Sequence, residues 1–393
     1  MSARRVGPAA SHHRPLLTAR HQLHRIAHLA HLHLPAPLLR QVDRAGPLES
    51  PWVAAALGGL LAGSVLLTVR HHRRAGPPAH VRRRWLRRTG LAAWLSGLTV
   101  LTGLAGLNVY VGYVPTLPGL LGAVPSPGRD GGSRVARLMV GAPDLDVPPS
   151  PAYVYLPPGY DQPGNAARRY PVVYLLHGYP GGPSDWFRGA QVQQVMDAML
   201  RDRLVQPMIV VAPDASGGWL HDSEMLNQVG GPQVATYLTR TVVAAVDGAY
   251  RTVPDRGARA IGGMSSGGYG ALNLGLRHQG VYSVILSEMP YGHPGPVTWS
   301  LLGGSHALWL ANSPSHYIPT ITFQHPMAVD LLAGSRDRTR GGAVRLARML
   351  AARGQQAQDT IVPDANHTWR GARAELPYAL AFASQHLTVR GRA

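Results

Sequence analysis

The feature of this sequence that most constrains its fold is a glycine-flanked serine, in Gly263-Met264-Ser265-Ser266-Gly267. The apolar run 258–261 before it is typical of a buried strand, and residues 269–276 after it can continue as a helix. A serine on such a strand-to-helix turn is cramped, and side chains two residues before and after it would collide. Glycine at both positions removes that collision. The pattern therefore predicts a strand, a tight turn that exposes the Ser265 hydroxyl, and a helix packed on a sheet.

Short apolar runs alternate with amphipathic stretches through residues 135–393. We expect strands at 135–140, 153–156, 171–176, 208–212, 258–261, 281–286, 327–332 and 360–362, and helices at 192–203 and 234–250. Continuous apolar strands that alternate with helices predict a largely parallel sheet covered on both faces, which is an α/β fold.

A serine hydroxyl becomes a nucleophile when a base takes its proton and an acid orients that base. In the arrangement typical of a glycine-flanked serine, the acid and the histidine follow the serine in the chain, each on a loop after a strand. Asp337 follows the apolar run 329–333, and His367 follows the run 361–363. We therefore predict a catalytic triad of Ser265, Asp337 and His367.

Other acids compete for the third position. Glu288 ends an expected strand and would suit a variant triad, while Asp364 lies close to His367 in the sequence. Asp330 falls inside or before its strand, which favours a structural role.

The negative charge that develops on the substrate oxygen during acyl transfer needs backbone donors. The N–H of Ser266 and that of Tyr179, which follows Gly178, are the expected pair. Trp186 and Trp369 are candidates for lining a substrate pocket, although packing in the core is the usual role of such side chains. The same alternatives hold for the tryptophans at 219, 299 and 309.

Residues 1–50 are basic, with seven arginines against Asp43 and Glu49. They show no sustained apolar periodicity, and residues 20–34 could form a basic amphipathic helix on anionic lipid. The seven histidines between positions 12 and 33 lack acidic or cysteine partners at ligand spacing, so we expect no metal site there. We expect a tail in solvent or on a membrane surface.

Two uncharged apolar stretches follow, at 52–69 and from 89 to at least 113. Each is long enough to cross most of a bilayer, and the segment 70–88 between them holds eight arginines and no acid. Two buried core helices would leave those arginines poorly solvated. Residues 51–114 are therefore predicted to be a pair of transmembrane helices, in contact with membrane lipids.

Arginine asymmetry predicts the orientation of this pair. A short, strongly basic loop stays in the cytoplasm, so everything after residue 114 is expected outside the cell membrane. This orientation also requires the basic residues 1–50 to lie outside, and their positive charge argues against it. A Pro- and Gly-rich linker, residues 115–134, is expected to lead into the catalytic domain at 135–393.

Composition excludes several classes of protein. The chain is 45% hydrophobic, too apolar for a wholly disordered protein. Its net charge of +18 falls mostly outside the catalytic region, and no nucleic-acid-binding motif is present. With no cysteine, disulfides and thiolate metal sites are impossible.

Several motifs together resemble one family. These are the runs 156–160 and 170–178, the glycine-rich turn at 262–272 and His367-Thr368-Trp369. They resemble the esterase family of the α/β-hydrolase fold that includes esterase D, feruloyl esterase domains and the mycobacterial mycolyltransferases. The likeness covers about residues 135–388 and implies the triad and the oxyanion donors named above. Mycolyltransferases use glutamate as the acid, so an aspartate at 337 is nearer to the esterase branch.

The expected function is that of a membrane-anchored serine esterase acting on carboxylic esters by acyl transfer, without metal or organic cofactor. An acyltransferase that moves an acyl chain to a sugar or glycerol hydroxyl of envelope lipids would use the same triad. A membrane-tethered binding module that has lost catalysis is the remaining alternative, and the complete set of Ser, acid and His argues against it.

Overall fold

A computed structural model describes residues 34–74, 81–121, 131–218 and 221–388. At its centre is a sheet of eight strands in the order β1-β2-β4-β3-β5-β6-β7-β8. The strands are β1 Arg134–Ala142, β2 Val147–Leu156, β3 Val172–Leu176, β4 Ile209–Ala212, β5 Arg259–Met264, β6 Val284–Glu288, β7 Ala328–Gly334 and β8 Gln356–Val362. The pairs β1 with β2 and β2 with β4 are antiparallel, and all other neighbouring pairs are parallel. This confirms the predicted α/β class.

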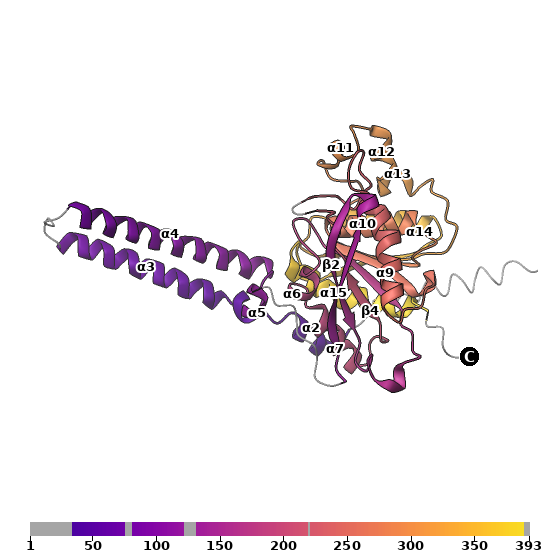
Figure 1. Ribbon diagram of the computed structural model, residues 1–393, viewed down its shortest axis with the longest axis horizontal. Helices are drawn as coiled ribbons and strands as arrows, with labels where there is room; N and C mark the ends of the chain where they lie inside the picture. Colours follow the sequence, from indigo (N-terminus) through magenta and orange to yellow (C-terminus); the bar gives the residue numbers. More distant parts are fainter. Residues whose placement is uncertain (1–33, 75–80, 122–130, 219–220, 389–393) are drawn as a thin grey trace, which may run out of the picture.

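Helices cover both faces of the sheet (Figure 1). One face packs against α9 Val242–Ala249, α10 Ser266–Arg277 and α14 Arg340–Ala352. The other packs against α7 Val192–Arg201 and α15 Trp369–His386. Side chains of β3 alternate between these two cores, with Val173 and Leu175 on the second face. Such alternation is the reason why a strand buried on both sides reads as a continuous apolar run.

The remaining elements are short. They are α2 Ala36–Val42, α5 Leu117–Leu120, α6 Asp185–Arg188, α8 Val234–Thr236, α11 Thr298–Leu301, α12 His306–Ala311, α13 Pro314–Tyr317, a π-helical turn at Tyr237–Thr241 and the 3-10 turns Pro47–Glu49, Pro143–Leu145, Pro163–Asn165 and Arg256–Ala258. The helix expected at 234–250 is therefore α8, the π-helical turn and α9 in succession. Helices α11 to α13, between β6 and β7, lie together at the top of the sheet domain in Figure 1.

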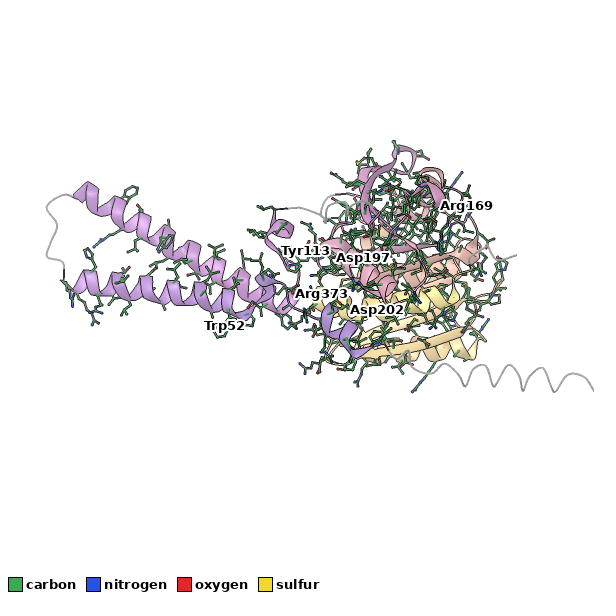
Figure 2. All side chains as sticks on the ribbon, turned by 90° about the horizontal axis from the view of Figure 1, so that it is seen from below. Trp52, Tyr113, Arg169, Asp197, Asp202 and Arg373 are labelled. Atoms are coloured by element: carbon green, nitrogen blue, oxygen red, sulfur yellow. The ribbon has the colours of Figure 1, made fainter. Side chains whose placement is uncertain are left out.

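Two long helices, α3 Pro51–Arg74 and α4 Val81–Val111, pack against each other and project from the sheet domain (Figure 1). Within the described residues, Pro51–His71 and Arg88–Val111 are long and apolar enough to cross a membrane, and almost none of their side chains is buried. Trp52, at the start of α3, is 81% exposed and stands free of the domain (Figure 2). This exposure excludes the alternative that these are core helices.

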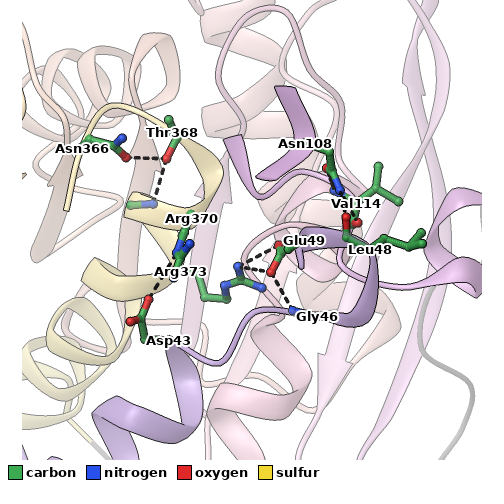
Figure 3. Close-up of polar contacts among 11 residues, drawn as sticks. Asp43, Gly46, Leu48, Glu49, Asn108, Val114, Asn366, Thr368, Arg370 and Arg373 are labelled. Carbon is green, nitrogen blue, oxygen red and sulfur yellow. Dashed lines mark hydrogen bonds and ion pairs between the residues drawn. The ribbon is translucent and has the colours of Figure 1, made fainter. Parts of the chain in front are cut away.

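The end of the tail expected at 1–50 is folded instead of solvated. Leu38 and Val42, on one face of α2, are buried against α7 and α15. Glu49 is fully buried, where it accepts two hydrogen bonds from Arg373 of α15, at 2.8 and 2.9 Å (Figure 3). The sequence did not indicate this short amphipathic helix, because residues 1–50 as a whole are basic and show no sustained apolar periodicity. The possible amphipathic helix at 20–34 and the histidines at 12–33 lie outside the described residues, apart from Leu34.

A side chain from α4 joins the N-terminal segment to the end of the hairpin. The Asn108 amide donates to the carbonyl oxygens of Leu48 (3.0 Å) and Val114 (2.9 Å) and accepts from the N–H of Val114 at 2.8 Å (Figure 3). The linker expected at 115–134 contains α5, and its residues 122–130 are outside the described chain. The Asn108 amide thus ties the segment before α3 to the segment after α4.

Candidate active site

Ser265 lies on the turn between β5 and α10. Its backbone has φ +55° and ψ −117°, a conformation that side-chain-bearing residues seldom adopt. A Cβ on Gly263 would come within 2.4 Å of the Gly267 carbonyl oxygen, and one on Gly267 within 2.2 Å of the Leu176 carbonyl oxygen. Both glycines are therefore required by close backbone approach, as the sequence pattern predicts.

The structure brings Ser265, His367 and Asp337 together. The distance from His367 Nε2 to Ser265 Oγ is 2.8 Å, and His367 Nδ1 lies 3.0 and 3.2 Å from the two carboxylate oxygens of Asp337. Ser265 follows β5, Asp337 follows β7 and His367 follows β8, all at the carboxyl ends of parallel strands. The three side chains thus meet at one edge of the sheet, although Ser265 and His367 are 102 residues apart in the sequence.

The Asp337 carboxylate is fixed by other donors as well. Its Oδ1 accepts from the N–H (2.7 Å) and the hydroxyl (2.9 Å) of Thr339. Burial alone would raise the pKa of Asp337, but the hydrogen bonds from His367 and Thr339 outweigh burial and hold the pKa below its usual value. Asp337 is therefore ionised at neutral pH and can stabilise a charged imidazole ring.

The competing acids have other surroundings. Glu288 is fully buried, and desolvation together with the nearby Glu375 raises its pKa well above the usual range. Asp364 is exposed and pairs with Arg336 at 2.6 Å. Asp330 accepts from Thr360 at 2.8 Å, while burial raises its pKa to about 7. Among the described acids, Asp337 is the one hydrogen-bonded to His367.

The loop after β3 lies against the serine. A Cβ on Gly178 would sit 3.5 Å from the Cβ of Ser265, so the backbone of Gly178 and Tyr179 passes beside the nucleophile. Ser266 is the first residue of α10, and its N–H therefore has no partner within that helix. Gly178, which precedes Tyr179, and Ser266 both adjoin Ser265, and the N-terminus of α10 adds a favourable field for negative charge.

Trp186 and Trp369 pack in the core, which differs from the expectation that they line a substrate pocket. Their rings meet edge to face at 5.5 Å between centroids, and their exposed fractions are 0% and 6%. Sequence alone does not separate a pocket aromatic from a core aromatic. Trp299 is 48% exposed, on α11, and Trp219 lies outside the described residues.

Two residues near the site have no signal in the sequence. Glu224, only 5% exposed, accepts from the Tyr291 hydroxyl at 2.8 and 2.6 Å. Tyr291 in turn stacks on Tyr269 of α10, with ring centroids 5.2 Å apart. Burial, with a contribution from the charge of Asp222, raises the pKa of Glu224 to about 7. No strand or periodic run precedes Glu224, so no pattern points to it.

A groove of about 720 Å³ lies between α2, the end of α4 and the loops after β7 and β8. Asn366 and Arg336, neighbours of triad residues, line it, but Ser265 and His367 do not. We therefore assign no substrate to this groove. In the described part of the chain, no group of three or more His, Asp and Glu side chains is arranged to hold a metal ion.

A mostly parallel eight-stranded sheet, with a serine turn after β5 followed in the chain by Asp337 and His367, defines an α/β-hydrolase. The model of the family described as "Putative esterase" matches residues 149–386. The chain belongs to this esterase family.

Curated relatives cover only part of the chain. An uncharacterized protein of Corynebacterium glutamicum is 28% identical over 168 residues, 42% of this chain and 39% of that protein. An esterase of Mycobacterium tuberculosis is 29% identical over 145 residues, 37% of this chain and 29% of that protein. This chain therefore matches well under half of the length of either relative.

Solved structures share the fold. An S-formylglutathione hydrolase from Agrobacterium tumefaciens has a TM-score of 0.55 at 17% identity, covering 67% of this chain and 99% of that one. A ferulic acid esterase has a TM-score of 0.54 at 23% identity, covering 65% of this chain and 98% of that one. At these identities the likeness concerns the fold alone.

Proposed function

We propose that this protein is a membrane-anchored serine esterase that cleaves carboxylic esters through Ser265, His367 and Asp337. The observation that carries this proposal is the unbroken row of hydrogen bonds from Ser265 Oγ through both ring nitrogens of His367 to Asp337. The orientation of the base by the acid and its contact with the nucleophile are the geometric requirements for this chemistry.

The reaction has two steps. His367 Nε2 takes the Ser265 proton while Oγ attacks the ester carbonyl carbon, and the N–H groups of Tyr179 and Ser266 hold the resulting oxyanion. The oxyanion collapses, the leaving alcohol receives the proton from His367, and an acyl-serine remains. His367 then deprotonates water, which attacks the acyl-serine and releases the acid. Throughout, Asp337 stabilises the charged His367 ring.

The proposed anchor is the α3–α4 hairpin, with the basic loop 70–88 in the cytoplasm and the catalytic domain outside. Support comes from the length, the apolar composition and the exposure of both helices. The domain lies at the start of α3 and the end of α4, away from the end of α3 and the start of α4 (Figure 1). One side of the membrane can therefore hold the domain and the other the loop.

A fluorophosphonate probe tests the nucleophile. It should label the full chain in membranes, and Ser265→Ala should abolish both labelling and turnover of a p-nitrophenyl ester, by at least about 10⁴-fold. The matched control is Ser300→Ala, because Ser300 is exposed on α11 and its hydroxyl donates only to the Val297 carbonyl oxygen in the described structure. It should retain both activities.

Folded wild-type protein that resists the probe and turns over no ester would contradict the proposal and favour a binding module. Product analysis with glycerol or trehalose added to the reaction separates hydrolysis from acyl transfer. Free acid as the sole product supports an esterase, and an acylated alcohol would move the assignment to an acyltransferase.

A further inference from the structure

The end of the membrane hairpin touches the loop that carries the oxyanion donor. Tyr113, two residues beyond α4, lies at the junction between hairpin and domain (Figure 2). Its hydroxyl donates to Asp185 Oδ1 at 2.8 Å. Asp185, at the start of α6, is 1% exposed, so the accepting end of this hydrogen bond is shielded from water. A polar contact of this kind fixes its partners more firmly than an exposed one.

Asp185 transmits this contact to the oxyanion loop. Its second oxygen, Oδ2, accepts from the N–H of Gly182 at 2.7 Å. A Cβ on Gly181 would lie 2.8 Å from the same oxygen and 2.6 Å from the carbonyl oxygen of Gly178. The carboxylate, Gly181 and the Gly178 peptide are therefore stacked in close contact, and the Gly178 peptide contains the N–H of Tyr179.

The Tyr113 ring also reaches the histidine loop. It packs against Trp369 with 6.4 Å between centroids, and Trp369 is the first residue of α15, two positions after His367. Arg188 supplies a second link on the other side, because it donates to the Gly119 carbonyl oxygen of α5 at 3.4 Å and to Ser184 Oγ at 2.6 Å. Residues just beyond the hairpin thus contact both loops that flank Ser265.

We propose that Tyr113 is a positioning residue for the reaction: through Asp185 it holds the loop 178–182 so that the Tyr179 N–H points at the developing oxyanion. The membrane hairpin is then part of the catalytic unit as well as an anchor. Burial, together with the charge of Asp185, raises the pKa of Tyr113 above its usual value, so the hydroxyl stays a donor through the working pH range. This inference rests on the proposed function, because it needs an oxyanion to be stabilised.

The test is Tyr113→Phe in the full chain, solubilised in detergent. The substitution removes the hydroxyl and keeps the ring against Trp369. The matched control is Tyr110→Phe, one turn earlier on α4, where the side chain is 63% exposed and makes no hydrogen bond in the described structure. The two variants lose the same atom from the same helix end.

The readouts are kcat, KM and the inhibition constant of a trifluoromethyl ketone. Ser265 Oγ adds to the ketone carbon, the C=O π electrons become an alkoxide in the oxyanion site, and His367 takes the serine proton. A misplaced oxyanion donor weakens this adduct and the transition state, but not ground-state binding. Tyr113→Phe should lower kcat and raise the inhibition constant, each by about tenfold, with KM changed less than about twofold.

Asp185→Asn supplies a second measurement. If Tyr113 acts through Asp185, the double variant should lose little more than the worse single variant, because the two side chains share one hydrogen bond. Additive losses would contradict the route through Asp185. Wild-type values for Tyr113→Phe, or a lower melting temperature with unchanged kcat and inhibition constant, would overturn the inference. Failure of the wild type to label at Ser265 would remove the proposed function itself, which is a distinct result.

Discussion

At the scale of single residues, the serine turn depends on a space that only glycine leaves free. Gly267 has backbone oxygens of Leu176 and His177 at 2.2 and 2.6 Å from the position of a Cβ. Those oxygens belong to the end of β3 and its loop, so they cannot move without displacing the oxyanion donor. A methyl group at position 267 would therefore force the backbone to shift, because no flexible side chain is there that could move aside instead.

We expect Gly267→Ala to lower the free energy of unfolding by about 3 kcal/mol or more and to abolish fluorophosphonate labelling. Gly164→Ala is the control, because no atom lies within 4 Å of its Cβ position. Thermal unfolding and probe labelling of both variants measure the effect. Equal behaviour of the two would mean that the turn has room for a side chain at position 267.

Glu224 makes stability depend on pH. Its pKa is raised from 4.5 to about 7, chiefly by burial, so the folded state binds a proton more tightly than the unfolded state does. The resulting stability is complete below pH about 4.5 and is lost as the pH rises through 7. The loss amounts to about 3.5 kcal/mol, since each unit of pKa difference corresponds to about 1.4 kcal/mol.

Glu224→Gln should therefore flatten the fall in melting temperature between pH 4.5 and 7.5. Asp330 titrates with the same sign, because burial raises its pKa to about 7 as well, so the wild type and the variant must be compared at each pH. The difference between the two curves belongs to Glu224. A difference that stays constant over this range would refute the buried, protonated state.

Single residues also show what the sequence can predict. The positions of Ser265, Asp337 and His367 follow from strand order, because every parallel strand delivers the loop after it to the same edge. The burial of Trp186 in the core and the burial of the Glu224 carboxyl cannot be predicted in this way. Each depends on the side chains that pack around it and not on its neighbours in sequence.

At the scale of elements, the N-terminal segment is bound to the domain by the Glu49 and Arg373 pair. Both side chains are 0% exposed, and Glu49 also accepts from the Gly46 N–H at 2.8 Å. Removing one partner of such a pair leaves the other charge buried without compensation. The partners are 324 residues apart, so no local pattern could have revealed that residues 36–50 belong to the fold.

Glu49→Ala should cost about 3–5 kcal/mol of unfolding free energy. Asp43→Ala is the matched control from the same segment: Asp43 pairs with Arg370 of the same helix α15, but at 3.5 Å and on the surface. Its removal should cost less than about 1 kcal/mol. Denaturant unfolding of both variants gives the comparison, and a small loss for Glu49→Ala would show that the segment is dispensable.

At the scale of the whole molecule, the distribution of arginines along the hairpin predicts its orientation in a membrane. The segment 70–88 has eight arginines and no acid, and Arg74 at the end of α3 and Val81 at the start of α4, both within it, lie at the end of the hairpin away from the sheet domain (Figure 1). Short basic loops remain in the cytoplasm, which would place Ser265 outside. The chain has no cysteine, so one introduced thiol reports the side of the membrane without background.

We expect a membrane-impermeant maleimide to label Gly164→Cys in intact cells, because Gly164 is exposed on the catalytic domain. Arg74→Cys, at the end of α3 and within the basic loop 70–88, should be labelled only after the cells are lysed. Labelling in the reverse order would place the esterase domain in the cytoplasm and its substrates with it. Labelling of Arg74→Cys and Gly164→Cys together in intact cells would mean that α3 and α4 do not cross the membrane, and the hairpin would then act on the active site only through its contacts at Tyr113.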